Sequence, residues 1–392
     1  MLDLRGLIAL LVAGLGLCAA NANAAHYRYG ACSQHAKLML YACFADRADD
    51  YLVHRADCAY VTAAEDEREC LLDARAERAE KADECNEVYA ARLDLCDLVG
   101  ERRYDIAFEP EDFVDPNDIG DSVDPNQYWP LTAGHTHVIV AESEDDDGEM
   151  VREVVVVTAT EEVRDVGGLP CRVIRDLVFE EEEEGEYSAL EVTQDWYGQI
   201  GAAGAARGIG ELGDTVYCGE NTFEVEDDLV DNTDGSFAHD TDRAKAGFLV
   251  RQNPAVGTGD RQEMFSDEAE DYVRYEALMA SPSDEEGGDV EGALACDGGC
   301  LKTYELNPRE PDGAEHKYYL PGIGFVLATK LDEDGVPTGE REEVTCVTSS
   351  LTDALDMGEA CGINDADALR DAMCAGSPEA EWLPEDLCDG GD

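Results

Sequence analysis

The stretch CAYVTAAEDEREC, residues 58–70, lies at the centre of a symmetric set of six cysteines. The six are Cys32, Cys43, Cys58, Cys70, Cys85 and Cys96, separated by 11, 15, 12, 15 and 11 residues. The spacings read the same in both directions, as expected for two antiparallel helices joined by a turn near residue 64. Residues 31–99 contain no Gly or Pro and are rich in Ala, Leu, Glu and Arg, which favour helices. The sequence therefore predicts a helical hairpin over residues 25–100.

The same spacing predicts which cysteines pair. A step of 11 residues turns a helix by a net of about 20°, and a step of 15 by about 60°, so the cysteines stay on one facing stripe. Successive cysteines on one helix are about 16 Å or more apart, too far to bond to each other. We expect the bridges Cys32–Cys96, Cys43–Cys85 and Cys58–Cys70. The alternative, a metal site, would need the cysteines to cluster.

The turn of the hairpin has a signal of its own. Thr62 followed by Glu65 matches a capping box, which predicts that the second helix begins near Ala63. Carboxylates are favoured in the first turn of a helix, so part of the acidity of this stretch is local helix-start chemistry.

Composition restricts the partners of the chain. Its 392 residues include 28 basic and 91 acidic side chains, a net charge of −63. Such a surface repels nucleic acid and anionic membranes, and it attracts divalent cations and basic partners. This excess of acidic over basic residues is typical of proteins adapted to salt, because salt screens the repulsion between like charges. The alternative explanation is a dedicated role in cation binding.

The first residues indicate export. Residues 1–24 match a signal peptide, with a 12-residue apolar core and an Ala-x-Ala site that predicts cleavage after Ala24. Leu17 before Cys18 disfavours a lipoprotein signal. Removal of Cys18 leaves 14 cysteines and no CxxC motif, so we expect disulfides in a secreted protein, periplasmic or extracellular, without membrane insertion.

The rest of the chain divides into three parts. Residues 101–131 contain four prolines and a repeated Val-Asp-Pro-Asn, which predicts an extended linker. Residues 132–349 contain many short β-type runs separated by turns, which predicts an antiparallel β domain, either a curved sheet or an open barrel. Residues 350–392 form a Cys-containing tail. The expected fold class is thus α+β, with a disulfide-stapled helical hairpin before the β domain.

Several segments resemble a known group of proteins. They are PLTAGHTHVIV, CRVIRDLV, DWYGQ, YCGENTFEVED, RQEMF and EHKYYLPGIGFVLA, within residues 125–349. The chain there is similar to secreted bacterial proteins of unassigned function, with EHKYYxPGxG-type antiparallel β domains. The resemblance implies the fold of this part and no particular activity. The chain departs from the group at HTH and in a Gly/Ala-rich insertion at 198–213.

Two groups of residues are candidate metal ligands. His135, His137 and Glu142, in HTHVIVAE, match the first metal motif of cupins and would suit a transition metal, although the second motif is not found. The acidic stretch 226–242 offers oxygen ligands for Ca²⁺ at Asp227, Asp228, Asp231, Asp234 and Asp240, without EF-hand spacing. For each group the plainer alternative is a solvated polar face or hairpin.

The remaining cysteines predict further bridges. Cys171 and Cys218 lie on β-type runs and are expected to pair, as are Cys300 and Cys346. Cys296, Cys361, Cys374 and Cys388 are left for the tail, with their pairing open.

No catalytic motif is recognisable, so the first expectation is a non-enzymatic cell-envelope or extracellular interaction or assembly protein. Such a protein would be cation-dependent, self-associating or bound to a cell-surface partner. The alternative is a binding module, in which the β domain holds a small ligand or a metal, Ca²⁺ or a transition metal.

Overall fold

The computed structural model describes residues 30–144, 150–183, 185–226, 229–284, 294, 296, 298–332, 334–375 and 388. The chain forms two compact units, Met1–Tyr104 and Asp105–Asp392. The expected signal peptide, residues 1–24, lies outside the described residues. Within the described part of the chain, no helix combines the length and apolar character needed to span a bilayer.

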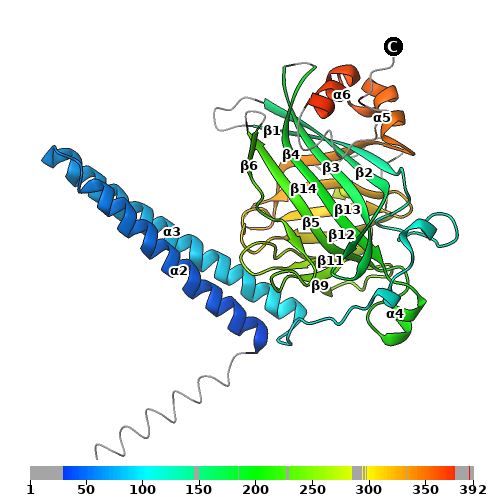
Figure 1. Cartoon of the computed structure of the whole chain (residues 1–392), viewed down its shortest axis with the longest axis horizontal. Coiled ribbons are helices and arrows are strands. Elements are labelled where there is room, and N and C mark those ends of the chain that lie inside the picture. Colours follow the sequence, from blue (N-terminus) through cyan, green and yellow to red (C-terminus); the bar gives the residue numbers. More distant parts are fainter. Residues whose placement is uncertain are drawn as a thin grey trace, which may run out of the picture. The chain divides into compact units, whose positions relative to one another are not determined.

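The first unit is a hairpin of two long helices, α2 (Ala31–Cys58) and α3 (Ala64–Val99), drawn in blue to cyan (Figure 1). Three disulfides join them, Cys32–Cys96, Cys43–Cys85 and Cys58–Cys70, with Cα atoms 5.5, 5.9 and 5.7 Å apart. These are the pairs that the symmetric spacing predicts, so the hairpin and its register are confirmed. We call this unit the arm.

The two helices share little apolar surface. The buried side chains of the arm are Cys32, Ser33, Ala36, Cys58, Ala74, Cys85, Ala91, Arg92, Leu95 and Cys96. Cysteine and alanine dominate this interface, and burial of such small side chains contributes little hydrophobic free energy. The disulfides are therefore the main connection between α2 and α3.

The predicted capping box at the turn is wrong. Helix α3 begins at Ala64, so the N-cap is Ala63, which makes no side-chain cap hydrogen bond. Thr62 lies one residue too early to cap the helix. The acidic first turn, with Glu65, Asp66 and Glu67, still faces the positive end of the helix dipole.

The second unit is a 15-stranded antiparallel sheet that curls into a nearly closed barrel (Figure 1). Its order is β10-β8-β5-β4-β3-β2-β1-β15-β14-β13-β12-β11-β9, with β6 and β7 paired to β5. The strands are β1 (Thr136–Glu144), β2 (Met150–Val166), β3 (Leu169–Glu183), β4 (Glu186–Gln199), β5 (Thr215–Glu226), β6 (Leu229–Asn232), β7 (Phe237–Ala238), β8 (Lys245–Val250), β9 (Gly259–Arg261), β10 (Glu263–Met264), β11 (Tyr272–Ala280), β12 (Cys300–Leu306), β13 (Glu315–Leu320), β14 (Gly324–Leu331) and β15 (Pro337–Thr348). The predicted β domain is thus confirmed, in its barrel-like form.

The two edges of the sheet meet in one stretch of chain, residues 259–264, which we call the seam. Its first half, β9, pairs with β11, and its second half, β10, pairs with β8. Gly247 of β8 lies so close that a Cβ atom there would collide with the carbonyls of Arg261 and Gln262. Since one continuous segment bonds to both edges, the barrel has almost no free edge.

Residues 105–131 belong to this unit, although the sequence suggested only a linker. The segment contains two short helices, η1 (Pro110–Asp112) and η2 (Pro116–Asp118), and buries Phe113, Ile119 and Leu131. Its buried Asn126 donates from Nδ2 to the carbonyl of Gly213, two residues before β5, and from its backbone N–H to Gln199 Oε1 at the end of β4. The segment therefore closes one end of the barrel.

Helices cover part of the outer face of the barrel. Besides η1 and η2, the described residues of this unit form the helices α4 (Ala202–Arg207), η3 (Pro282–Asp284), α5 (Leu351–Met357), η5 (Gly358–Cys361) and α6 (Ala366–Ala375). Leu351, Leu355 and Met373 of α5 and α6 pack on outward-facing apolar residues of β1–β4, and both helices lie at one end of the barrel in Figure 1. These strands are therefore buried on both faces.

The disulfides of the β unit correct one prediction. Cys171 and Cys218 are bonded, as expected, but Cys300 bonds to Cys296 and Cys346 bonds to Cys361. Cys300 lies on β12 and Cys346 on β15, with β13 and β14 between them, so they are about 14 Å apart at the usual strand spacing. That exceeds the reach of a disulfide. The last bridge is Cys374–Cys388.

Candidate functional site

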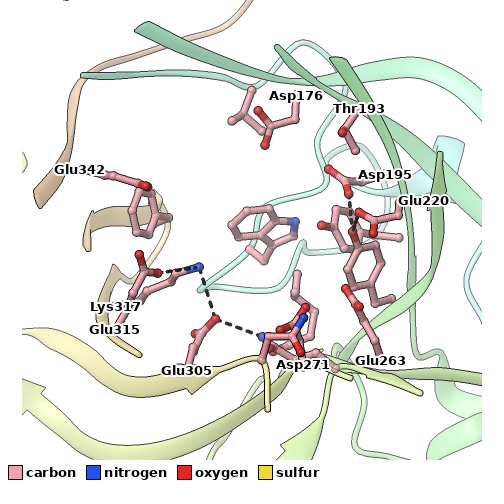
Figure 2. Close-up of a pocket in the computed structure, with 18 of the residues that line it drawn as sticks. Asp176, Thr193, Asp195, Glu220, Glu263, Asp271, Glu305, Glu315, Lys317 and Glu342 are labelled. Atoms are coloured by element: carbon pink, nitrogen blue, oxygen red, sulfur yellow. Dashed lines mark hydrogen bonds and ion pairs between the residues drawn. The ribbon is translucent and has the colours of Figure 1, made fainter. Parts of the chain in front are cut away.

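The interior of the barrel contains a cavity of about 480 Å³ (Figure 2). Its floor is aromatic and lies toward the closed end. Trp129 packs edge-on against Tyr197 with ring centroids 5.7 Å apart, and Tyr197 lies 4.6 Å from Tyr217. Tyr319 and Phe325 complete the floor, with ring centroids 6.0 Å apart. The exposed residues Glu310 and Gly313 also line the cavity, so it reaches the surface.

Carboxylic acids dominate the walls above this floor. One group comes from β3, β4, β5, β10 and the residue before β11, and we call it the acid wall: Asp176, Glu191, Asp195, Glu220, Glu263 and Asp271. The opposite group comes from β12, β13, β15 and a loop, and we call it the lysine wall: Glu305, Glu310, Glu315, Glu342 and Lys317. Lys317 is the one basic side chain among the described residues that line the cavity.

Strand alternation brings these acids inside. On β4, Glu191, Thr193, Asp195 and Tyr197 share one face and line the cavity. Val192 and Trp196 point outward, where they are buried in the clusters on the outside of the sheet. The polar face is therefore the inner face, the reverse of the usual arrangement in a water-soluble sheet.

The acid wall is short of hydrogen-bond donors. Tyr217 Oη lies 2.5 Å from Asp195 Oδ1 and 2.6 Å from Glu220 Oε2. One hydroxyl has one proton to donate, so it cannot serve both carboxylates at once. Glu263 is 4% exposed, and its carboxyl meets another carboxyl, that of Asp271. The Oδ1 atom of Asp176 is buried and has no partner in the described part of the chain.

The lysine wall is the better satisfied. Lys317 Nζ lies 3.4 Å from Glu315 Oε2 and 3.7 Å from Glu305 Oε2. Glu305 also accepts hydrogen bonds from Tyr319 Oη at 2.7 Å and from Gln262 Nε2 of the seam at 3.2 Å. Burial works against the charge of Lys317, but Glu305 and Glu315 outweigh it and raise the pKa of the ammonium.

The titration behaviour follows this asymmetry. Burial, with nearby like charge, raises the pKa of Asp195 to about 7 and that of Asp271 to about 6. The pKa values of Asp176, Glu220 and Glu263 are raised well above the usual range for the same reason. On the opposite side, burial raises the pKa of Glu342 to about 7. The acid wall thus retains protons near neutral pH because no basic side chain belongs to it.

The predicted histidine site is not assembled as a three-ligand group. His135 and His137 lie together, and the Nε2 atoms of both bond to the carbonyl of Ile323, at 2.9 and 3.0 Å. Because each ring donates from Nε2, only Nδ1 retains a lone pair. Glu142 is exposed, lies five residues along β1 and faces the other side of the strand. Burial lowers the pKa of His137 to about 4.

The predicted calcium residues are also dispersed. Asp227 and Asp228 lie outside the described residues. Asp240 pairs with Lys245 Nζ at 2.7 Å, while Asp231 lies on β6 and Asp234 in the turn that follows. None of the three belongs to a group of metal-ligand atoms in the described ranges.

One such group exists in the described residues, and it lies on the arm. His54, Cys58 and Cys70 have ligand-type atoms within 4.8 Å of one another, but the two sulfurs are bonded to each other. A disulfide sulfur is not the thiolate that binds metal, so this group is structural.

Sequence reasoning missed the acid-lined cavity. It noted the acidic surplus and assigned it to loops and surface. The available signal was the alternation Glu-x-Thr-x-Asp-x-Tyr at 191–197, which places polar residues on one face. Since the other face is also buried, the usual inference that the polar face meets solvent does not hold here.

No family model matches the chain, and no curated protein matches it. Among solved structures, it is similar to one described as a "putative lipoprotein" from Parabacteroides distasonis, with 13% identity, a TM-score of 0.23, and coverage of 56% of this chain and 97% of that chain. It is also similar to a "putative exported protein with YmcC-like fold" from Bacteroides fragilis, with 11% identity, a TM-score of 0.23, and coverage of 57% and 99%. At this level of similarity we base the function on the cavity alone.

Proposed function

We propose that this chain is an exported binding protein whose barrel holds a positively charged ligand in its interior. Ten carboxylic acids and one lysine among the described residues line the cavity, and this imbalance supports the proposal most directly. An acid-lined hollow with low-dielectric walls attracts cations more strongly than an exposed acidic surface does. The cavity volume lies within the range of small-molecule sites.

Export is supported by the covalent framework. Seven disulfides join fourteen cysteines of the chain. Disulfides of this number form and persist in oxidising compartments. The cavity favours the binding role, offered by the sequence only as the alternative, over an assembly role.

Calorimetric titration of the full mature chain tests this function. The titrants are Ca²⁺, Mg²⁺, tetramethylammonium and butylamine, with butanol and butyrate as uncharged and anionic matches. We expect at least one cation to bind, whereas butanol and butyrate should not. The Glu220→Gln chain should bind the cation more weakly, because the variant lacks a carboxylate of the acid wall. Glu359→Gln, an exposed acid on η5, is the matched control and should behave as the native chain. Equal binding to native and Glu220→Gln chains would contradict the proposal.

A further inference from the structure

The lysine wall shows what kind of cation this cavity accommodates. Lys317 places a primary ammonium at the end of an aliphatic chain between Glu305 and Glu315, within 3.7 Å of both. Figure 2 shows this ammonium with both carboxylates on one side of the cavity. The chain has therefore satisfied one wall with an alkylammonium of its own.

The acid wall presents the same chemistry without its counter-ion. Around the barrel, β4 and β13 are separated by five strands in one direction and by a similar number in the other, so they face each other. Tyr217 Oη reaches both Asp195 and Glu220, and Tyr197 also hydrogen-bonds Asp195. The carboxyl of Glu263 hydrogen-bonds that of Asp271, and no lysine or arginine among the described residues belongs to this wall. Asp176 Oδ1, buried and without a hydrogen-bond partner in the described residues, is a second, independent observation that points to a ligand at this wall.

The space between the walls excludes a single metal ion as a good fit. A cavity of about 480 Å³ holds a molecule of many atoms, and one ion cannot contact two opposite walls of it. The aromatic floor supplies the remaining preference. Tyr and Trp faces stabilise ammonium groups through cation–π interaction and methylene groups through burial, whereas metal ions prefer oxygen ligands.

We propose that the ligand is a flexible aliphatic chain carrying two or more ammonium groups, bound between the acid wall and the remaining carboxylates of the lysine wall. This inference rests on the proposed function, which requires only a positive charge. An oligoamine and the lysine side chains of a peptide offer the same chemistry, so both are arms of the test.

Binding of such a ligand exchanges ammonium groups for protons. Burial raises the pKa of Asp195 to about 7, so an arriving ammonium releases a proton that the acid wall retains near neutral pH. The groups that face Asp195 are Asp176 from β3, Glu191 and Tyr197 on β4, Tyr217 and Glu220 from β5, and Glu263 from β10. Affinity should therefore fall as pH falls through about 7.

The experiment is a calorimetric titration at high salt, so that the highly charged surface is screened and the cavity is observed. Butylamine, diaminobutane, spermidine and spermine add one ammonium at a time, a trilysine peptide represents the peptide source, and Ca²⁺ the metal. We expect affinity to rise about tenfold or more with each added ammonium, because each gains a close carboxylate partner. Titration in two buffers of different ionisation enthalpy should reveal proton release.

Two variants locate the binding. Glu263→Gln and Asp176→Asn are nearly isosteric with the protonated acids, so both should fold, and each should weaken spermine binding about tenfold or more. Glu359→Gln is the matched control. Spermine binding that survives both variants unchanged would overturn the inference, because the amine would then be held by the outer surface.

The two proposals fail differently. If Ca²⁺ or butylamine binds as tightly as spermine, and Glu263→Gln weakens that binding, the oligoamine inference is wrong and the cation-binding function stands. If no cation binds in a manner that depends on Glu263, both are wrong. If trilysine outcompetes spermine, the inference that the cavity binds several ammonium groups stands, and the ligand is a lysine-containing peptide rather than an oligoamine.

Discussion

Tyr217 lies at the most crowded part of the acid wall. Tyr217 Oη is within 2.6 Å of two carboxyl groups, those of Asp195 and Glu220, and can donate its proton to only one. Asp195 also hydrogen-bonds Tyr197 and Glu220, and burial beside like charge raises the pKa of both acids, so that one of them remains protonated. At the scale of residues, the barrel thus holds like-charged groups together by keeping some of them neutral.

Tyr217→Phe should expose this arrangement. Burial raises the pKa of Asp195 to about 7, and the hydrogen bond from the Tyr217 hydroxyl partly opposes this rise. Removal of the hydroxyl should therefore raise the pKa of Asp195 further. Carboxyl-carbon NMR titration of the native and variant chains measures the shift, with Tyr60→Phe, an exposed tyrosine of the arm, as the control. An unchanged or lowered pKa of Asp195 would show that the hydroxyl does not stabilise the carboxylate.

At the scale of elements, the arm and the barrel are stabilised by different means. The arm has one large aliphatic side chain, Leu95, among its buried residues. Three disulfides join its helices, together with partly exposed polar pairs such as His54–Glu77. Most of the stability of a helix in a protein comes from packing rather than from helix propensity. An interface of small side chains buries little apolar area and therefore contributes little free energy. The barrel instead has continuous ladders and several apolar clusters.

Removal of the three arm bridges should unfold the arm and spare the barrel. In a variant with Cys32→Ala, Cys43→Ala, Cys58→Ala, Cys70→Ala, Cys85→Ala and Cys96→Ala, we expect most of the helical circular dichroism to be lost. Each bridge contributes on the order of 2–4 kcal/mol by restricting the unfolded chain. The chain's three tryptophans lie outside the arm, so their fluorescence should be unchanged.

The control for this variant is Cys58→Ala with Cys70→Ala, which removes only the bridge nearest the turn. It should fray the tip and leave most of the helical signal. Full retention of helix in the six-cysteine variant would show that side-chain packing, and not the disulfides, holds the arm together.

At the scale of the whole molecule, the interior acids make folding depend on pH in an unusual direction. The pKa values of Asp195 and Glu342 are raised from 3.8 and 4.5 to about 7. The folded chain therefore binds more protons than the unfolded chain over this interval. Their stabilising contribution is complete below about pH 4 and is lost as pH rises through about 7.

The thermal midpoint of the unliganded chain should therefore be higher near pH 5 than near pH 8. Acids whose pKa is lowered by folding destabilise the chain at low pH. The hydrogen bond with His316 lowers the pKa of Glu276, so the stability that Glu276 contributes is lost as pH falls below 4.5. A loss of about 2 kcal/mol between pH 5 and pH 8 corresponds to roughly 4–8 °C. Scanning calorimetry measures it, and a flat or rising profile would contradict the assignment of buried protonated acids.

Helix geometry explains what could be predicted. The three arm bridges follow from spacing because a helix relates sequence distance to height and angle locally. The bridges of Cys300 and Cys346 could not be predicted, since strand order decides which strands are neighbours. The same is true of the acid wall, whose members come from five places in the chain. His135 and His137 were found as a pair, but their partner, the carbonyl of Ile323, lies more than 180 residues away.

The closed end of the barrel has a consequence for the order of events in folding. Asn126 makes its hydrogen bonds to Gln199, Gly213 and Val250, which follow it by 73, 87 and 124 residues. Contacts of such long sequence separation form slowly, because the intervening chain must first be ordered. The segment that carries Trp129 is made early but can settle only after β4, β5 and β8 are in place. We therefore expect Trp129 to reach its place in the aromatic floor last, after pairing of the strands that carry Tyr197 and Tyr217.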